Sequence, residues 1–120
     1  MTETRTVTVP TIDHGPITIS CPSWCTGHGG QPAQYRADLN HSGPEHAFNF
    51  HNDRVFTALL SQYPFGNGSR ETGLHIEEAG FAATLDPAGL RQLAATLTVH
   101  AAHLRTLAGQ LATLLEEGGR

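Results

Sequence analysis

The sequence predicts an α+β fold: a small antiparallel sheet with a zinc-knuckle loop, followed by one long C-terminal helix. Three observations lead to this prediction. Short β-branched stretches, separated by glycine and proline, occupy residues 1–85. The only two cysteines stand close together in the turn-rich segment 21–46, and residues 86–117 are rich in helix formers. At 120 residues, we expect one domain spanning 1–120.

The strands are expected where β-branched and aromatic residues lie between turn residues. Pro10 should end the first strand or confine it to a sheet edge, because proline cannot donate to a sheet. Residues 22–46 are expected to be a loop, and Pro64 should stop the longest strand. The expected strands are Thr4–Ile12, Ile17–Ser20, His46–Phe50 and Arg54–Tyr63, followed by a hairpin with arms Gly73–Glu77 and Gly80–Leu85.

Asp86 and Pro87 mark the clearest boundary in the sequence. Aspartate is a strong N-cap residue, and proline fits the first helical position because its missing N–H costs nothing there. The predicted helix ends near Glu117, before Gly118 and Gly119. A break near Thr98–His100 is the alternative.

The helix carries an a/d heptad pattern, with Leu at one position and mostly Ala at the other. A helix of about thirty residues is about 45 Å long, which is longer than a sheet of short strands covers. We therefore expect a homodimer through this helix, with antiparallel contact favoured by the small alanines, against a monomer with a bent helix. His100 and His103 are expected to face solvent or to border the dimer seam. The heptad residues are Leu90, Leu97, Leu104 and Leu111, then Ala94, Ala101, Ala108 and Leu115; of these, Leu97, Leu104 and Leu111 are candidate interface residues.

The stretch CPSWCTGH indicates a metal site. Cys21, Cys25 and His28 can converge from one tight turn, and tetrahedral Zn²⁺ needs a fourth ligand. His41 is the preferred one, because it stands in a turn and Asp38 precedes it by three residues. That carboxylate is expected to accept the spare imidazole N–H of a ligand. His46 and His51 remain alternatives to His41.

Other interpretations of the cysteines stay open. They include a Cys21–Cys25 disulfide, reduced cysteines in a small core, and a Cys25 nucleophile. Four protein ligands would close the metal's coordination shell and favour a structural role, whereas a catalytic zinc keeps one position open. Trp24, between the cysteines, is expected to cover the metal site, with an exposed anchor for a partner as the alternative.

Composition excludes some functions. The net charge is −4, and the seven arginines are scattered, so a sequence-independent grip on nucleic acid is not expected. The N-terminus lacks an apolar signal segment, and no apolar run is long enough to cross a bilayer. We expect a cytoplasmic protein without membrane contact. In that compartment a close cysteine pair more often binds metal or does redox work than forms a structural disulfide.

The motif CPSWC…H, followed by DLNHSGP, resembles that of a family of small actinobacterial proteins known only as a domain of unknown function. The shared positions are Cys21, Pro22, Trp24, Cys25, His28, Asp38, His41 and Gly43. The resemblance implies this site, together with strands and an Ala/Leu-rich C-terminal helix, and supplies no activity.

The combined observations predict a non-enzymatic, zinc-stabilised binding or regulatory module that works through contact with itself or with another protein. Two alternatives remain. A nucleic-acid-binding regulator would need Arg36, Arg54 and Arg70 on one face, and a small metal-dependent hydrolase would need a three-ligand site with a bound water.

Overall fold

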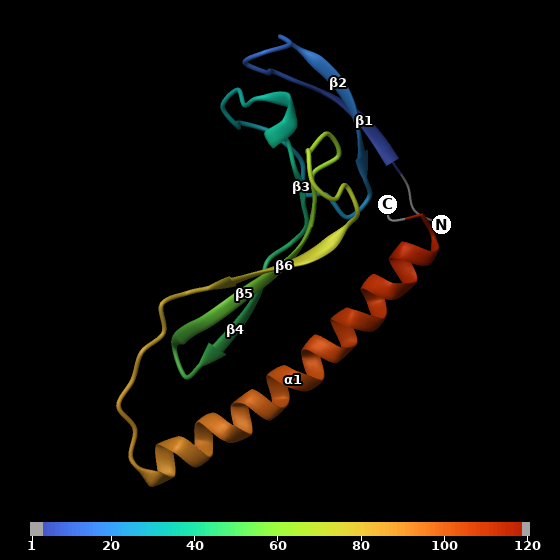
Figure 1. Ribbon diagram of the computed structural model, residues 1–120. Coiled ribbons are helices and arrows are strands. Elements are labelled where there is room, and N and C mark those ends of the chain that lie inside the picture. Colours follow the sequence, from blue (N-terminus) through green and yellow to red (C-terminus); the bar gives the residue numbers. More distant parts are fainter. Residues whose placement is uncertain (1–3, 119–120) are drawn as a thin grey trace.

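A computed structural model describes residues 4–118 and shows the predicted α+β architecture (Figure 1). Two small antiparallel sheets are followed by one long helix, which runs beside the strands toward the N-terminal end of the chain. The elements are β1 (Thr4–Val9), β2 (Ile17–Pro22), a short 3₁₀ helix (Arg36–Asp38), β3 (His41–Ser42), β4 (His46–Phe50), β5 (Asp53–Gln62), β6 (Gly73–Glu78) and α1 (Pro87–Glu116).

Strands β1 and β2 form an antiparallel hairpin in which Arg5 lies opposite Cys21. The first strand ends at Val9, directly before Pro10, and is therefore shorter than the expected Thr4–Ile12. The second runs two residues past Ser20, so Cys21 belongs to a strand rather than to the following loop. This places the first cysteine on a hydrogen-bonded scaffold.

Strand β5 is the spine of the second sheet. Strands β3 and β4 pair one after the other along it, and β6 pairs with it as well. A register shift between Phe48 and Asn49 interrupts the β4–β5 ladder. The two-residue strand β3 was not expected, and it carries His41.

The predicted second arm of the hairpin, Gly80–Leu85, is wrong: these residues form no strand. The Ala79 amide still donates to the Val55 carbonyl at 3.1 Å. Gly80 then adopts a positive φ of 76°, which turns the chain away from β5. The following segment leads to the start of α1 instead of pairing, and Phe81 lies edge-on to Phe50.

Helix α1 is continuous over 30 residues, which confirms the unbroken helix and not the alternative break. The Asp86 side chain accepts a hydrogen bond from the Gly89 amide at 2.7 Å, and Pro87 occupies the first turn. Beyond the helix, Gly118 has a φ of 97°, a left-handed conformation that suits glycine at a helix end.

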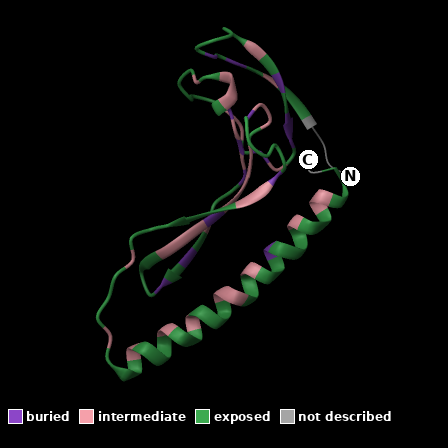
Figure 2. Cartoon of the chain, in the orientation of Figure 1, coloured by how far each residue is buried: buried purple, intermediate pink, exposed green. Residues whose placement is uncertain are grey.

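The buried side chains form two separate clusters rather than one core. One lies at the β1–β2 end and the other between β4, β5 and α1; within α1 only Leu107 is buried (Figure 2). The chain is correspondingly elongated, at 56 × 31 × 24 Å. The first cluster contains Val9, Ile19, Cys21, Cys25 and Leu39, and the second contains Phe48, Ala58 and Leu107.

Candidate metal centre

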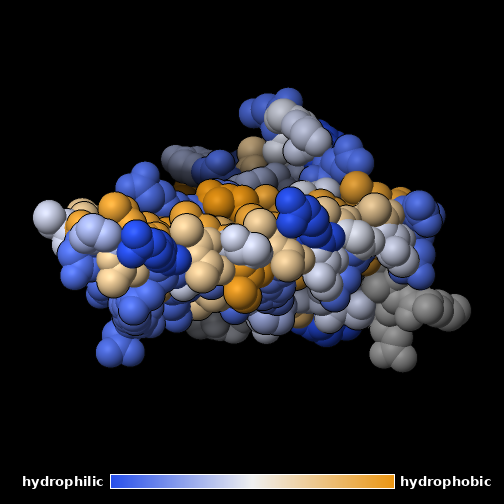
Figure 3. All heavy atoms as spheres, turned by 90° about the horizontal axis from the view of Figure 1, so that it is seen from below, coloured by the Kyte–Doolittle hydropathy of each residue, from blue (hydrophilic) through white to orange (hydrophobic). Residues whose placement is uncertain are grey.

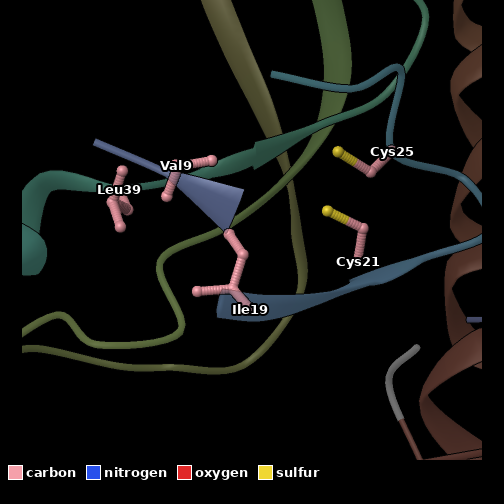
Figure 4. Close-up of a cluster of buried hydrophobic side chains, with 5 residues drawn as sticks. All are labelled: Val9, Ile19, Cys21, Cys25 and Leu39. Atoms are coloured by element: carbon pink, nitrogen blue, oxygen red, sulfur yellow. The ribbon is translucent and has the colours of Figure 1, made fainter. Parts of the chain in front are cut away.

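The structure brings Cys21, Cys25, His28 and His41 together, with their four ligand atoms within 4.8 Å of one another. Cys21 comes from β2 and His41 from β3, while Cys25 and His28 lie in the loop between them. The two sulfur atoms point to the same side (Figure 4). Both cysteines are free thiols, so the disulfide alternative is not formed here.

Backbone hydrogen bonds shape the loop that carries Cys25. Its amide donates to the Pro22 carbonyl at 3.0 Å, which closes a tight turn directly after β2. The Arg5 guanidinium donates to the Cys25 carbonyl at 2.7 Å, and the Thr26 amide donates to Ser42 at 2.9 Å. The loop is thereby tied both to β1 and to β3.

Gly27 takes part in the same turn. Its φ is 108°, a conformation that favours glycine, and its amide lies 3.4 Å from the Cys25 sulfur. The turn therefore directs a backbone N–H donor at a sulfur of the cluster.

Two separations between the ligand atoms fit a tetrahedral metal. With Zn–S bonds of about 2.3 Å and Zn–N bonds of about 2.0–2.1 Å, a tetrahedral site has S···N edges of about 3.5 Å and an N···N edge of about 3.3 Å. In the structure, Cys25 Sγ lies 3.6 Å from His28 Nε2, and His28 Nε2 lies 3.3 Å from His41 Nδ1. These two measured separations match the edges expected around zinc.

Burial makes the thiolate form of Cys21 unfavourable when no cation is bound. Cys21 is fully buried, and Cys25 and His41 are nearly so. Burial, followed by the adjacent Cys25 thiol, raises the pKa of Cys21 to about 11, although the positive charge of Arg5 opposes this increase. A divalent cation reverses that balance, since it binds the thiolate directly.

The described residues leave two buried polar atoms of the site region without a hydrogen-bond partner: His28 Nδ1 and Trp24 Nε1. His28 directs its other nitrogen, Nε2, toward the cluster. Asp38, predicted to accept from a ligand histidine, stands at the end of the 3₁₀ helix with an exposed side chain. Its role as the partner of a ligand stays a prediction.

Trp24 packs against the cluster of buried side chains around the cysteines and lies edge-on to His41, with ring centroids 6.3 Å apart. This agrees with a ring that covers the site. Its other surroundings form an apolar groove of about 220 Å³ between the second sheet and the C-terminal half of α1. Leu60, Leu111 and Leu114 are among the residues that line this groove.

The histidines left outside the cluster lie elsewhere. His46 is on β4, where its ring contacts His103, and His51 is an exposed residue of the β4–β5 turn. Neither joins the four ligands, so the geometry favours His41 over both alternatives.

His103 is exposed, as expected, and His100 is half-buried, but both also contact β4. His100 Nε2 lies 2.7 Å from the Asn49 carbonyl oxygen, and the His103 ring lies 4.9 Å from that of Phe48. The heptad pattern missed this contact because it considers leucine and alanine alone.

The arginines of the nucleic-acid alternative are spread along β5 and do not gather at one place. Arg36 lies over the Phe65 ring, and Gln62 at the end of β5 donates to the Arg70 carbonyl. Arg54 stands at the other end of β5, about 26 Å from Gln62 at about 3.3 Å per residue, and pairs with Glu45.

The fold and the site define a small α+β protein with a Cys₂His₂ cluster suited to a metal ion. The chain belongs to DUF6907, a domain of unknown function, whose family model matches residues 6–113. No curated protein and no solved structure matches the chain. None of the helices among residues 4–118 combines the length and the apolar character that a membrane crossing requires.

Proposed function

We propose that this protein is a small binding or regulatory module whose fold is held together by a structural zinc ion. The observation that carries the proposal is the convergence of two sulfurs and two imidazole nitrogens within 4.8 Å of one another, with two of their separations close to tetrahedral edges. This ligand set is typical of structural zinc. Four protein ligands leave no open position for a water, so the hydrolase alternative is not favoured.

The zinc ion supplies a connection that burial alone does not. Cys21 belongs to the first sheet and His41 to the second, and the loop between them contains few buried residues. Ordering such a loop costs about 1–2 kcal/mol per residue in backbone entropy. Structural zinc in small modules supplies about 10–16 kcal/mol, which offsets much of that cost and joins the two sheets.

Elemental analysis of the purified protein tests the metal proposal, with Cys21→Ser as the variant and exposed His75→Ala as the control. We expect one zinc per chain in the wild type and in the control, and a loss of most of it from Cys21→Ser. A wild-type protein with less than half an equivalent, even after zinc is supplied during refolding, overturns the proposal.

The module acts through protein contacts, and its simplest partner is a second copy of the chain, bound through the C-terminal helix. Two features support this part of the proposal: α1 is longer than the sheet it packs on, and two of its leucines, Leu90 and Leu97, are exposed. We place the protein in the cytoplasm, where zinc-bound thiolates fit the reducing conditions.

A further inference from the structure

Helix α1 presents two apolar faces, and only one of them packs on the sheet. At about 100° per residue, Leu93, His100, Leu107 and Leu114 fall on one side of the helix, and Leu107 and His100 mark this side as the one facing β4 and β5. The heptad residues lie beside this face, on a flank that we call the Leu/Ala ladder. The ladder consists of Leu90, Ala94, Leu97, Ala101, Leu104, Ala108, Leu111 and Leu115.

The structure leaves much of the Leu/Ala ladder uncovered. Leu90 is 56 % exposed and Leu97 is 44 % exposed, and Ala94 and Ala108 are exposed as well. Leu104 and Leu111 are the ladder residues nearest the sheet-facing side, and both are partly buried against it. Figure 3, which views the molecule from below, shows hydrophobic side chains spread along this side, between polar ones.

The surface area indicates how much a partner has to cover. The chain exposes 7670 Å² for a mass of 12.8 kDa. A compact monomer of that mass exposes about 6,300 Å², so the chain exposes about 1,400 Å² more. A standard interface removes about 800 Å² from each partner. One such interface therefore accounts for most of the excess.

We propose that the Leu/Ala ladder pairs with the ladder of a second copy in antiparallel orientation. This inference rests on the proposed function and specifies its partner, its face and its geometry. Antiparallel pairing about the middle of the ladder places large residues against small ones. The opposed pairs are Leu97 with Ala108, Ala101 with Leu104, Ala94 with Leu111, and Leu90 with Leu115 at the two ends.

A parallel pair lacks this complementarity. It sets leucine against leucine and alanine against alanine, so that crowded layers alternate with layers that leave gaps, and gaps forfeit packing energy. Charge favours the same choice. Arg91 lies near the helix N-terminus and Glu116 and Glu117 near its C-terminus, each unfavourable toward its own helix dipole. Antiparallel pairing brings these opposite ends together.

Light scattering of the zinc-loaded full chain tests whether the pair forms. We expect the mass of two chains for the wild type and of one chain for Leu97→Glu. The matched control is Val99→Glu, because Val99 is 66 % exposed on the same helix but lies off the ladder; this variant should keep the mass of two chains. Circular dichroism and zinc content show whether each variant is folded.

The outcomes separate this inference from the metal proposal. A wild-type mass of one chain at high micromolar concentration, with a full equivalent of zinc, overturns the antiparallel pair and leaves the zinc proposal intact. Equal loss of the dimer in both glutamate variants also overturns the assignment of the face. A wild-type protein that has the mass of two chains but contains no zinc contradicts the metal proposal and leaves the antiparallel pair intact.

Thiol cross-linking of two single variants tests the orientation. With pairing about the ladder's middle, the two Ala101→Cys residues are offset by about 4.5 Å along the helices, and the two Ala94→Cys residues by about 25 Å. A short bifunctional maleimide should therefore link Ala101→Cys chains and not Ala94→Cys chains. Linkage of both variants overturns the antiparallel geometry in favour of a parallel one, and the wild type measures any background from Cys21 and Cys25.

Discussion

Each ligand residue of the metal centre depends on a different local structure. Cys21 is held by the β1–β2 ladder, where Arg5 lies opposite it, and His41 is held by two residues of pairing with β5. Cys25 and His28 depend on a loop that Arg5 and Ser42 anchor through hydrogen bonds. The cluster thus stands partly on a rigid scaffold and partly on a segment that benefits from the metal.

Substitution of single histidines decides which one completes the site. We expect His41→Ala to lose zinc affinity by orders of magnitude, because a three-ligand site admits water and leaves buried thiols uncompensated. His51→Ala, at an exposed turn, should bind as tightly as the wild type. Competition with a chromophoric chelator measures both affinities. Equal affinities in the two variants would show that His41 is not a ligand.

The start of helix α1 is fixed by its N-cap residue, Asp86. The Asp86 carboxylate accepts from the Gly89 amide in the first turn, an interaction between residues only three positions apart. The middle of the helix is different, since its position depends on contacts with Phe48 and Asn49 across the sheet.

Removal of the cap should weaken the helix start. Asp86→Ala is expected to lower the free energy of unfolding by about 1 kcal/mol, the typical value for an N-cap deletion. Asp86→Asn keeps an acceptor oxygen and should cost much less. Urea denaturation at one fixed protein concentration measures both, and a cost for asparagine as large as for alanine would contradict the capping role.

Removal of the one buried leucine of α1 tests how the helix is docked. Leu107→Ala should cost about 2–3 kcal/mol, within the range for buried leucines but not at its upper end, because the cluster borders a groove. The exposed Val99→Ala is the control and should change the free energy of unfolding by less than about 0.5 kcal/mol. Similar costs at both positions would mean that α1 does not pack on β4 through Leu107.

The whole molecule is divided into two halves with different sources of stability. The cluster at the β1–β2 end includes two ligand cysteines, so its packing is linked to the metal, whereas the Phe48–Ala58–Leu107 cluster contains none. The radius of gyration is 17.6 Å, compared with about 14 Å for a compact domain of this length. The halves are therefore joined by few contacts.

Chelation should act unevenly on the two halves. When zinc is removed, we expect amide hydrogen exchange to increase strongly over residues 17–46 and weakly over β5 and the middle of α1. The reason is that metal binding orders only the segment between β2 and β3. Exchange measured by mass spectrometry with and without chelator shows the pattern, and re-added zinc should restore it. A uniform increase would mean that the metal stabilises both halves equally.

Local chemistry in the sequence determined much of this protein. The Asp86 cap, and the absence of proline after Pro87, predicted a continuous α1. Pro10 ended β1. The CPSWCTGH spacing, together with His41, identified the four residues of the cluster. These features depend on neighbours along the chain, where spacing and side-chain type are sufficient evidence. The family resemblance pointed to the same positions, and membership in a domain of unknown function is now shown over residues 6–113.

Only the tertiary structure decided how these parts meet. It showed that residues 80–85 leave the sheet, because Gly80 redirects the chain toward the start of α1. It also showed that α1 turns His100 and Leu107 toward β4 while part of its Leu/Ala ladder stays open. A helix with apolar residues on two adjacent faces can pack by either one. Which face is buried depends on residues about fifty positions away along the chain, which no local pattern contains.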